Sequence, residues 1–207
     1  MKNIDKKIFI AKIRDHTRRR HVDLSQYTHI RAYHACRPQN VGSYLNEGVK
    51  PFDRERMHSI ASDLFGLSTD EVVKSEGDLE TFDGRAYFNL FKKELLKHSG
   101  HYLVWGSEYL LKMAVELDQS NDGKYHNVLL RTGIPTIFTC DIPISMLKQE
   151  EAEDISRSYS KNHEDLSCWL FQPLPPEYIV GHDHPREMFD PIRWRKYINS
   201  QFTCPYC

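Results

Sequence analysis

Apolar and polar positions in the first part of the chain predict one strand and a short helix. The segment Thr28–Cys36 is rich in β-forming residues and predicts a strand that ends before Pro38. The next segment, Gln39–Glu47, predicts a helix because its apolar residues recur at helical spacing and Gly48 offers a natural C-cap. A strand followed directly by a short helix is therefore the expected start of the fold.

The region Arg54–Gly100 predicts mainly helical and connecting structure. Ser68 and Glu71 have the spacing of a capping box, in which each side chain bonds the other's backbone N–H at a helix start. Arg85–His98 places its apolar residues on one helical face and predicts a further helix.

The second half of the chain alternates between predicted strands and helices. His101–Trp105 predicts a strand, and Ser107 then caps a helix with a continuous apolar side. We expect a helix over Pro143–Glu153 and further strands over Asn127–Arg131, Pro135–Asp141, Ser167–Pro173 and Glu177–Gly181. Helices early and strands late predict an α+β fold rather than a regular βαβ series. Without repeats or linkers, residues 1–207 are expected to form a single domain.

Composition adds few constraints. The chain has 207 residues, of which 40% are hydrophobic, 28% charged and 12% aromatic, which is ordinary for a globular protein with a sizeable core. No apolar run approaches the roughly 18 residues of a membrane span, and no secretory signal is visible at the N-terminus. We therefore expect a cytoplasmic protein without a membrane partner.

Charge is distributed unevenly along the chain. Residues 1–60 carry 13 Lys and Arg against six Asp and Glu, although the whole chain has a formal net charge of −1. The basic part includes the run Arg18-Arg19-Arg20 followed by His21. Two interpretations stay open: a contact for RNA or DNA, and a solvated basic segment.

The five cysteines do not suggest a disulfide framework, because their number is odd and most are isolated. A redox role for Cys204 and Cys207 is rejected, because no helix follows the first thiol to lower its pKa. His182 and His184 lie some twenty residues upstream and could complete a Cys₂His₂ zinc site. His-x-His spacing is unusual in structural zinc fingers, so the sequence assigns no metal, and the zinc question stays open.

Three segments together resemble the ADP-ribosyltransferase superfamily, in its His-Tyr-Glu branch that includes diphtheria-toxin-like enzymes and poly-ADP-ribose polymerases. The first runs from Arg31 to Pro51 and contains His34-Ala35-Cys36-Arg37, the second is His101–Ala114, and the third is Pro176–Val180 with Glu177. They follow one another in the family's order between residues 31 and 180. The resemblance implies a split β-sheet core, with a helical insert between the strands of the first and second motifs.

The resemblance also implies roles for individual residues. Glu177 would stabilise the oxocarbenium-like ribose formed when NAD⁺ loses nicotinamide, as a carboxylate does in glycoside cleavage. His34 would hold the ribose, and the backbone of Ala35 would clamp the nicotinamide carboxamide. The remaining implied roles are stacking on nicotinamide by Tyr102 and Tyr109, a bond from Ser107 to the carboxamide, and pyrophosphate binding by Arg37. The chain departs from the family pattern in having Ala35 in place of glycine.

The activity implied is mono-ADP-ribosyl transfer from NAD⁺, as substrate, to a macromolecular acceptor, either nucleic acid or protein. Enzymes of this kind resemble bacterial toxins and phage-defence effectors, which are held by an antitoxin protein. Two alternatives remain: an NAD⁺ glycohydrolase with the same site, and a zinc-stabilised nucleic-acid-binding module. The sequence does not separate transferase from glycohydrolase, and it favours the transferase over the binding module, which leaves the segments of Tyr102 and Glu177 unexplained.

Overall fold

The computed structural model describes residues 23–76, 84–120, 122–159, 166–199 and 204–207. Its core is a five-stranded sheet with strand order β4-β2-β1-β3-β5, in which every neighbouring pair is antiparallel. The strands are β1 (His29–Cys36), β2 (Ala86–Asn89), β3 (Thr136–Pro143), β4 (Ser167–Leu170) and β5 (Ile179–Asp183). A separate two-stranded sheet consists of β6 (Glu187–Asp190) and β7 (Arg195–Ile198). The α+β class expected from the sequence is confirmed.

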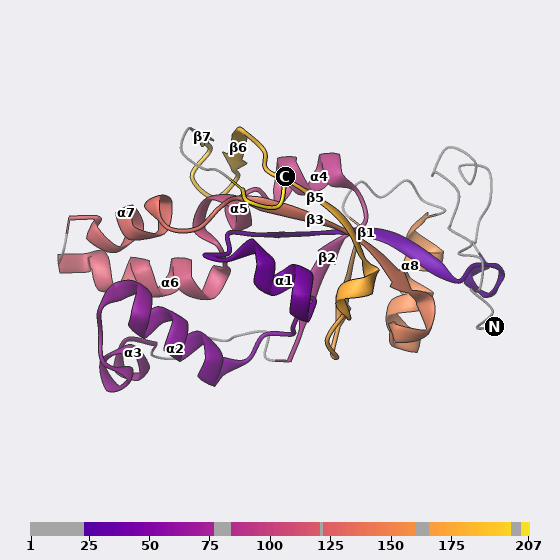
Figure 1. Cartoon of the computed structure of the whole chain (residues 1–207), viewed down its shortest axis with the longest axis horizontal. Helices are drawn as coiled ribbons and strands as arrows, with labels where there is room; N and C mark the ends of the chain where they lie inside the picture. Colours follow the sequence, from indigo (N-terminus) through magenta and orange to yellow (C-terminus); the bar gives the residue numbers. More distant parts are fainter. Residues whose placement is uncertain (1–22, 77–83, 121, 160–165, 200–203) are drawn as a thin grey trace.

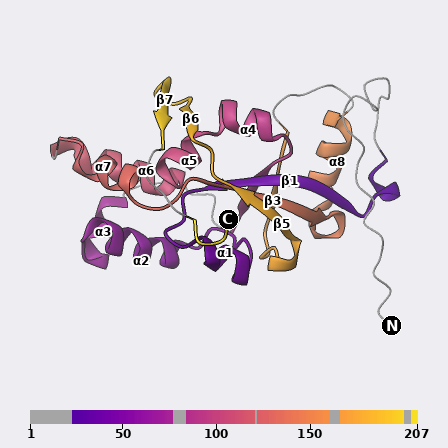
Figure 2. The ribbon, with the colours of Figure 1, turned by 45° about the horizontal axis from the view of Figure 1, so that its top comes forward.

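Helices gather mainly at the end of the sheet where β1 finishes, and α8 lies at the opposite end (Figures 1 and 2). The α-helices are α1 (Val41–Glu47), α2 (Arg54–Phe65), α3 (Thr69–Glu76), α4 (Lys92–His98), α5 (His101–Trp105), α6 (Glu108–Leu117), α7 (Lys124–Arg131) and α8 (Gln149–Tyr159). Short 3₁₀ turns occur at Leu24–Gln26, Asp118–Ser120, Ile144–Met146 and Pro176–Tyr178. None of these helices has the length and apolarity to cross a membrane.

Two hydrophobic clusters cover the two faces of the sheet. One contains Ala32, Phe88 and Phe138 and extends to α1 and α8. The other contains Ala35 and Ile137 and joins the sheet to α2, α3, α5, α6 and α7. Adjacent residues of a strand point to opposite faces, so β1 and β3 contribute to both clusters. This arrangement places the central strand β1 between two cores.

Several local expectations are confirmed. β1 matches the strand predicted over Thr28–Cys36, and the side chain of Asn40 caps α1, which ends at Gly48. The Ser68–Glu71 capping box is present, with the Ser68 backbone N–H donating to Glu71 at 2.8 Å and the Glu71 N–H to Ser68 Oγ at 3.3 Å. Ser107 caps α6 by accepting a hydrogen bond from the Leu110 N–H at 3.1 Å. In each case a local backbone requirement is met by a residue nearby in sequence.

Other expectations are wrong. His101–Trp105 and Asn127–Arg131 are helical rather than extended, and Arg85–His98 divides into strand β2 and helix α4. Four of the five residues of α5 are buried, so the apolar run had no polar face that could reveal its period. The second motif therefore lies on a helix, and the segment that precedes it contains β2 as well as helices. The basic run Arg18–Arg20 with His21 lies outside the described residues.

Candidate functional site

The sheet divides next to β1. Along one edge, β1 pairs with β3 over its whole length, from His29 opposite Pro143 to Cys36 opposite Thr136. Along the other edge, β1 and β2 share a single registered pair, Tyr33 with Asn89, and then diverge. Figure 1 shows β2 leaving the direction of β1 at this point. We call the space between the diverging strands the fork.

A cavity of about 390 Å³ lies in this fork. Strands β1, β2 and β4 contribute His34, Tyr87 and Trp169, and the turn between α5 and α6 contributes Gly106 and Ser107. His34 and Ala35 are neighbours on a strand and point to opposite faces, yet both line the cavity, because it opens at the edge of β1. We call it the fork cavity.

The fork cavity contains five of the residues that the sequence assigned to the site. They come from β1, α5 and the start of α6, and they are His34, Ala35, Tyr102, Ser107 and Tyr109. A second cavity of about 430 Å³ adjoins it, and the two share Cys36, Tyr44, Lys50, Arg56, Gly106 and Ser107. Cavities of this size are typical of small-molecule sites.

His34 is fixed across the fork. Its Nδ1 lies 2.9 Å from the backbone carbonyl oxygen of Tyr87, to which only a protonated Nδ1 can donate. Burial lowers the pKa of His34, while the bond to Tyr87 opposes that shift. The ring is therefore neutral at pH 7, and its Nε2 is a hydrogen-bond acceptor.

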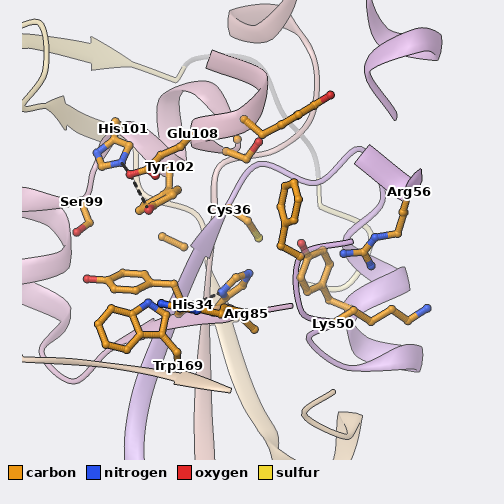
Figure 3. A pocket seen from close by; sticks show the side chains of 18 of the residues that line it. His34, Cys36, Lys50, Arg56, Arg85, Ser99, His101, Tyr102, Glu108 and Trp169 are labelled. Atoms are coloured by element: carbon orange, nitrogen blue, oxygen red, sulfur yellow. Dashed lines mark hydrogen bonds and ion pairs between the residues drawn. The ribbon is translucent and has the colours of Figure 1, made fainter. Parts of the chain in front are cut away.

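Tyr102 and Glu108 form a polar group on the wall made by α5 and α6 (Figure 3). The Tyr102 hydroxyl donates to Glu108 Oε1 at 3.0 Å, and His101 Nε2 lies 3.4 Å from the same oxygen. The contact with His101 and the bond from Tyr102 lower the pKa of Glu108 despite partial burial. Burial and the nearby carboxylate raise the pKa of Tyr102. Glu108 is thus ionised at pH 7, and Tyr102 stays protonated.

Basic side chains give the cavity positive charge in addition to the negative charge of Glu108. Its lining includes Lys50, Arg56, Arg85 and Lys112, against the single carboxylate of Glu108. Figure 3 shows Lys50 and Arg56 on one side and His101, Tyr102 and Glu108 on another. The cavity therefore has an excess of positive charge, with Lys50 and Arg56 on the side away from Glu108 and Lys112 one turn along α6 from it.

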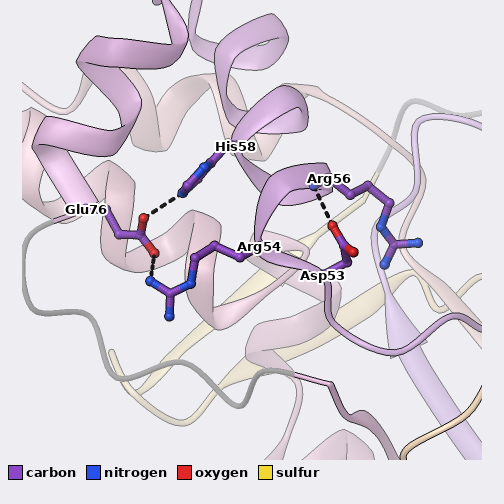
Figure 4. Close-up of polar contacts among 5 residues, drawn as sticks. All are labelled: Asp53, Arg54, Arg56, His58 and Glu76. Carbon is purple, nitrogen blue, oxygen red and sulfur yellow. Dashed lines mark hydrogen bonds and ion pairs between the residues drawn. The ribbon is translucent and has the colours of Figure 1, made fainter.

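The position of Arg56 follows from the packing of α2 against α3. Asp53 caps α2 by accepting a hydrogen bond from the Arg56 backbone N–H at 2.7 Å. The buried carboxylate of Glu76, on α3, is 2.7 Å from Arg54 Nη1 and 2.6 Å from His58 Nε2 (Figure 4). These ion pairs hold α2 to α3 and so orient the first turn of α2 toward the cavity.

Aromatic rings form much of the remaining wall. The ring of Tyr87 stacks on that of Tyr102 with centroids 5.8 Å apart. The ring of Trp169, on the neighbouring strand β4, lies 6.2 Å from that of Tyr87. Tyr109 packs against Phe52 at 5.7 Å, and burial raises the pKa of Tyr109 to about 12. Flat apolar faces beside cationic groups suit a ligand that has both aromatic rings and negative charge.

Glu177 lies away from this group. It is exposed on the 3₁₀ turn Pro176–Tyr178 and lines neither cavity. The ring of Tyr178 is 6.0 Å from His29, which is five residues along β1 from His34, roughly 16 Å at strand spacing. The physical reason is the strand order: β5 pairs with β3, on the side of β1 away from the fork. The structure therefore does not bring Glu177 together with His34 and Tyr102.

Arg37 lines the second cavity rather than the fork cavity, and its guanidinium group is held by the backbone. Its Nε, Nη1 and Nη2 donate to the backbone carbonyls of Thr132 at 2.7 Å, Leu103 at 3.2 Å and Leu130 at 2.5 Å. Burial lowers the pKa of Arg37 to about 10, which still leaves it charged at pH 7. All three nitrogens are engaged with the backbone, so this placement favours a structural role over pyrophosphate binding.

Sequence reasoning missed Glu108, Tyr87 and Trp169. Glu108 follows Ser107, which was recognised as a helix cap, and an acidic residue in the first turn of a helix has an ordinary structural explanation. Tyr87 and Trp169 belong to short strands whose positions depend on pairing with each other. Only the helix cap was a local signal that could have drawn attention to Glu108.

The four candidate metal ligands at the C-terminus are also brought together. His182 and His184 lie on β5, and Cys204 and Cys207 approach them from the final turn of the chain. They lie outside both cavities, so they form a second cluster rather than a part of the fork. The sequence assigns no metal and leaves the zinc question open; the structure brings the four candidate ligand atoms to within 4.8 Å of one another.

Comparisons with known proteins give no relative for this chain: no protein-family model, curated protein or solved structure matches it.

Proposed function

We propose that the chain is an NAD⁺-dependent mono-ADP-ribosyltransferase whose active site is the fork cavity. The observation that carries this proposal is that His34, Ala35, Tyr102, Ser107 and Tyr109 all line one cavity. These residues lie in two segments separated by more than sixty positions, and both segments resemble motifs of a family that binds NAD⁺.

The shape and charge of the site support a dinucleotide ligand. Two adjoining cavities that share a wall offer room for the two halves of such a molecule. Lys50 and Arg56 belong to that shared wall, where the pyrophosphate of a bound dinucleotide would lie between the halves. The rings of Tyr102 and Tyr109 supply flat faces for the nicotinamide, which is cationic before cleavage.

His34 is suited to holding a ribose. With Nδ1 donating to the Tyr87 carbonyl, its Nε2 is free to accept a hydrogen bond from a ribose hydroxyl. The bond to Tyr87 also prevents rotation of the ring, so the orientation exists before the ligand binds. Such preorganisation lowers the entropic cost of binding.

Glu108 is the carboxylate that we propose for the reaction, in place of Glu177. The bond between the nicotinamide nitrogen and the ribose C1′ breaks, and its electron pair leaves with neutral nicotinamide. Positive charge develops on the ribose, where an ionised carboxylate stabilises it. A nucleophilic oxygen or nitrogen of the acceptor then bonds to C1′ and loses its proton to water. Glu108 lines the cavity and has a lowered pKa, whereas Glu177 lines neither cavity.

The test compares two matched substitutions, Glu108→Gln and Glu177→Gln, in the full chain. We expect Glu108→Gln to lower kcat for NAD⁺ consumption by about 10²- to 10³-fold, the usual effect of losing one charge-stabilising group. Because glutamine keeps the volume, KM should change little. Glu177→Gln should retain wild-type turnover and unfolding temperature.

The opposite ranking, in which Glu177→Gln is inactive and Glu108→Gln is not, would return the catalytic role to Glu177. A wild-type chain that neither binds nor consumes NAD⁺, assayed in cell lysate and alone, would overturn the proposed function. It would leave the nucleic-acid-binding module as the better interpretation.

Incubation with adenylate-labelled NAD⁺ in whole-cell lysate identifies the acceptor. Label that becomes sensitive to nuclease indicates a nucleic acid, and label sensitive to protease indicates a protein. Free ADP-ribose as the only labelled product would instead identify an NAD⁺ glycohydrolase.

A further inference from the structure

Four side chains with metal-binding chemistry converge at the C-terminal end of the chain. The ligand atoms of His182, His184, Cys204 and Cys207 all lie within 4.8 Å of one another. Two of them come from β5 and two from the final turn, which is separated from β5 by β6 and β7. Ordinary core packing does not require two imidazoles and two thiols to lie in one place.

The distances within the cluster match a tetrahedral zinc site. His182 Nε2 lies 3.6 Å from Cys204 Sγ and 3.5 Å from Cys207 Sγ. Typical Zn–S and Zn–N bonds, about 2.3 Å and 2.0–2.1 Å, at a tetrahedral angle give an N-to-S separation of about 3.6 Å. The thiols and the imidazole are thus already spaced as they would be around one ion.

His184 is oriented by its surroundings. Its Nδ1 lies 3.0 Å from the carbonyl oxygen of Pro135 and 3.2 Å from the hydroxyl of Thr136. Donation from Nδ1 to the Pro135 carbonyl selects the tautomer in which Nε2 carries the lone pair. Zinc-binding histidines are commonly held through their second nitrogen in this way.

The chemistry of the four donor groups also points to one kind of metal ion. Two thiols and two imidazoles form a soft tetrahedral set that suits Zn²⁺ better than Mg²⁺ or Ca²⁺, which prefer oxygen.

We propose that His182, His184, Cys204 and Cys207 bind one structural Zn²⁺ that fastens the C-terminal turn to β5. Four protein ligands complete a tetrahedron and leave no position for substrate, which is typical of a structural rather than a catalytic zinc. The proposal does not depend on the NAD⁺ chemistry of the fork.

The C-terminal turn also contacts helix α1, through Tyr206. This residue lies between the two cysteines, and its hydroxyl occupies space beside Gly42, where a Cβ would fall only 2.1 Å away. Figure 2 shows the C-terminal turn next to α1. Tyr44, two residues further along α1, stacks on Phe138 at 4.7 Å and lies 5.8 Å from His34. Zinc at the C-terminus therefore supports the helix that packs against His34.

Metal content is the first measurement, made on the untagged full chain by elemental mass spectrometry. We expect about one zinc ion per chain, and less than about a tenth of that in Cys204→Ser and Cys207→Ser. Two matched controls should keep full zinc: His98→Gln, an exposed histidine on α4, and Cys168→Ala, a buried thiol in β4.

A second measurement covers the case in which the cysteine variants do not fold. Cobalt added to the metal-free wild-type chain should give the intense absorption of tetrahedral cobalt with thiolate ligands. Removal of zinc from the wild-type chain should lower Tm by about 8 °C or more, as expected for an ion present at 1,000 times its Kd.

Three results would overturn the proposal. The first is a folded wild-type chain that contains no zinc and gives only the weak spectrum of octahedral cobalt. The second is retention of zinc in the Cys204→Ser/Cys207→Ser double variant. The third is a disulfide between Cys204 and Cys207 in protein purified with reductant. The readouts are metal content and spectra, so failure here is distinguishable from failure of the proposed NAD⁺ activity.

Discussion

The two edges of β1 behave differently. Toward β3, all eight residues of β1 are in register, and the buried Asp141 bonds Arg31 Nε directly opposite at 2.5 Å. Toward β2, one registered pair is followed by divergence, and a cavity fills the space. We call these the closed edge and the open edge.

The difference shows how one strand serves both stability and binding. Continuous pairing at the closed edge satisfies the backbone and buries apolar side chains such as Ile30 and Ile142. At the open edge the strand ends its pairing early, and a side chain, His34, makes the bond to Tyr87 in place of the ladder. We expect changes at the closed edge to cost stability and changes at the open edge to cost ligand binding.

The largest expected effect is at the closed edge. Ile142→Ala removes a fully buried side chain opposite Ile30 and should lower the free energy of unfolding by about 3 kcal/mol, measured by denaturant titration. The matched open-edge variant, Tyr87→Leu, should lose less than about 1.5 kcal/mol and instead weaken NAD⁺ binding. Equal losses of stability in the two variants would contradict the comparison.

An intermediate effect is expected at Arg37, which follows the last residue of β1. Arg37→Met removes three hydrogen bonds to backbone carbonyls of α5, α7 and the turn after α7. We expect a loss of about 2 kcal/mol in unfolding free energy, because the carbonyls lose a charged donor. NAD⁺ affinity in the protein that remains folded should be unchanged. A large rise in Kd without a change in Tm would show that Arg37 binds the ligand instead.

The smallest effect concerns pH. Burial lowers the pKa of His34 below its usual 6.5, so the unfolded chain binds the proton more readily than the folded chain. Stability from this group is present above pH 6.5 and is lost as the pH falls through 6.5 toward the folded pKa. Between pH 7 and 5.5 the unfolding free energy of the wild-type chain should fall more than that of His34→Gln, as followed by thermal unfolding. Parallel pH profiles for the two proteins would show that His34 is not buried in its neutral form.

Local signals predicted the elements whose cause is local. The strand at Thr28–Cys36, the helix between Asn40 and Gly48 and the capping box at Ser68 all appear as expected, because each depends on residues within one or two turns. The failures have a common cause. His101–Trp105 and Asn127–Arg131 each contain only three or four consecutive apolar residues, a length at which a strand and a helix have the same pattern.

The candidate site was partly predictable for the same reason. His34 and Ala35 sit on a strand with a clear pattern, and Ser107 is a recognisable helix cap, so their segments could be placed in advance. The place of Glu177 could not be predicted, because its distance from His34 depends on which edge of the sheet β5 joins. Tyr87 and Trp169 enter the site through pairing between distant strands, and Glu108 enters it through the packing of α6 near β1, which no local pattern encodes.

The sequence by itself determined the α+β class, the caps and the central strand, since these follow from side-chain period and from backbone groups satisfied by near neighbours. Tertiary structure alone decided the strand order, the fork between β1 and β2, and the meeting of His182 and His184 with Cys204 and Cys207. The physical reason is that these features come from pairing and packing between distant segments, whose free energy depends on the whole assembled core rather than on any one stretch of chain.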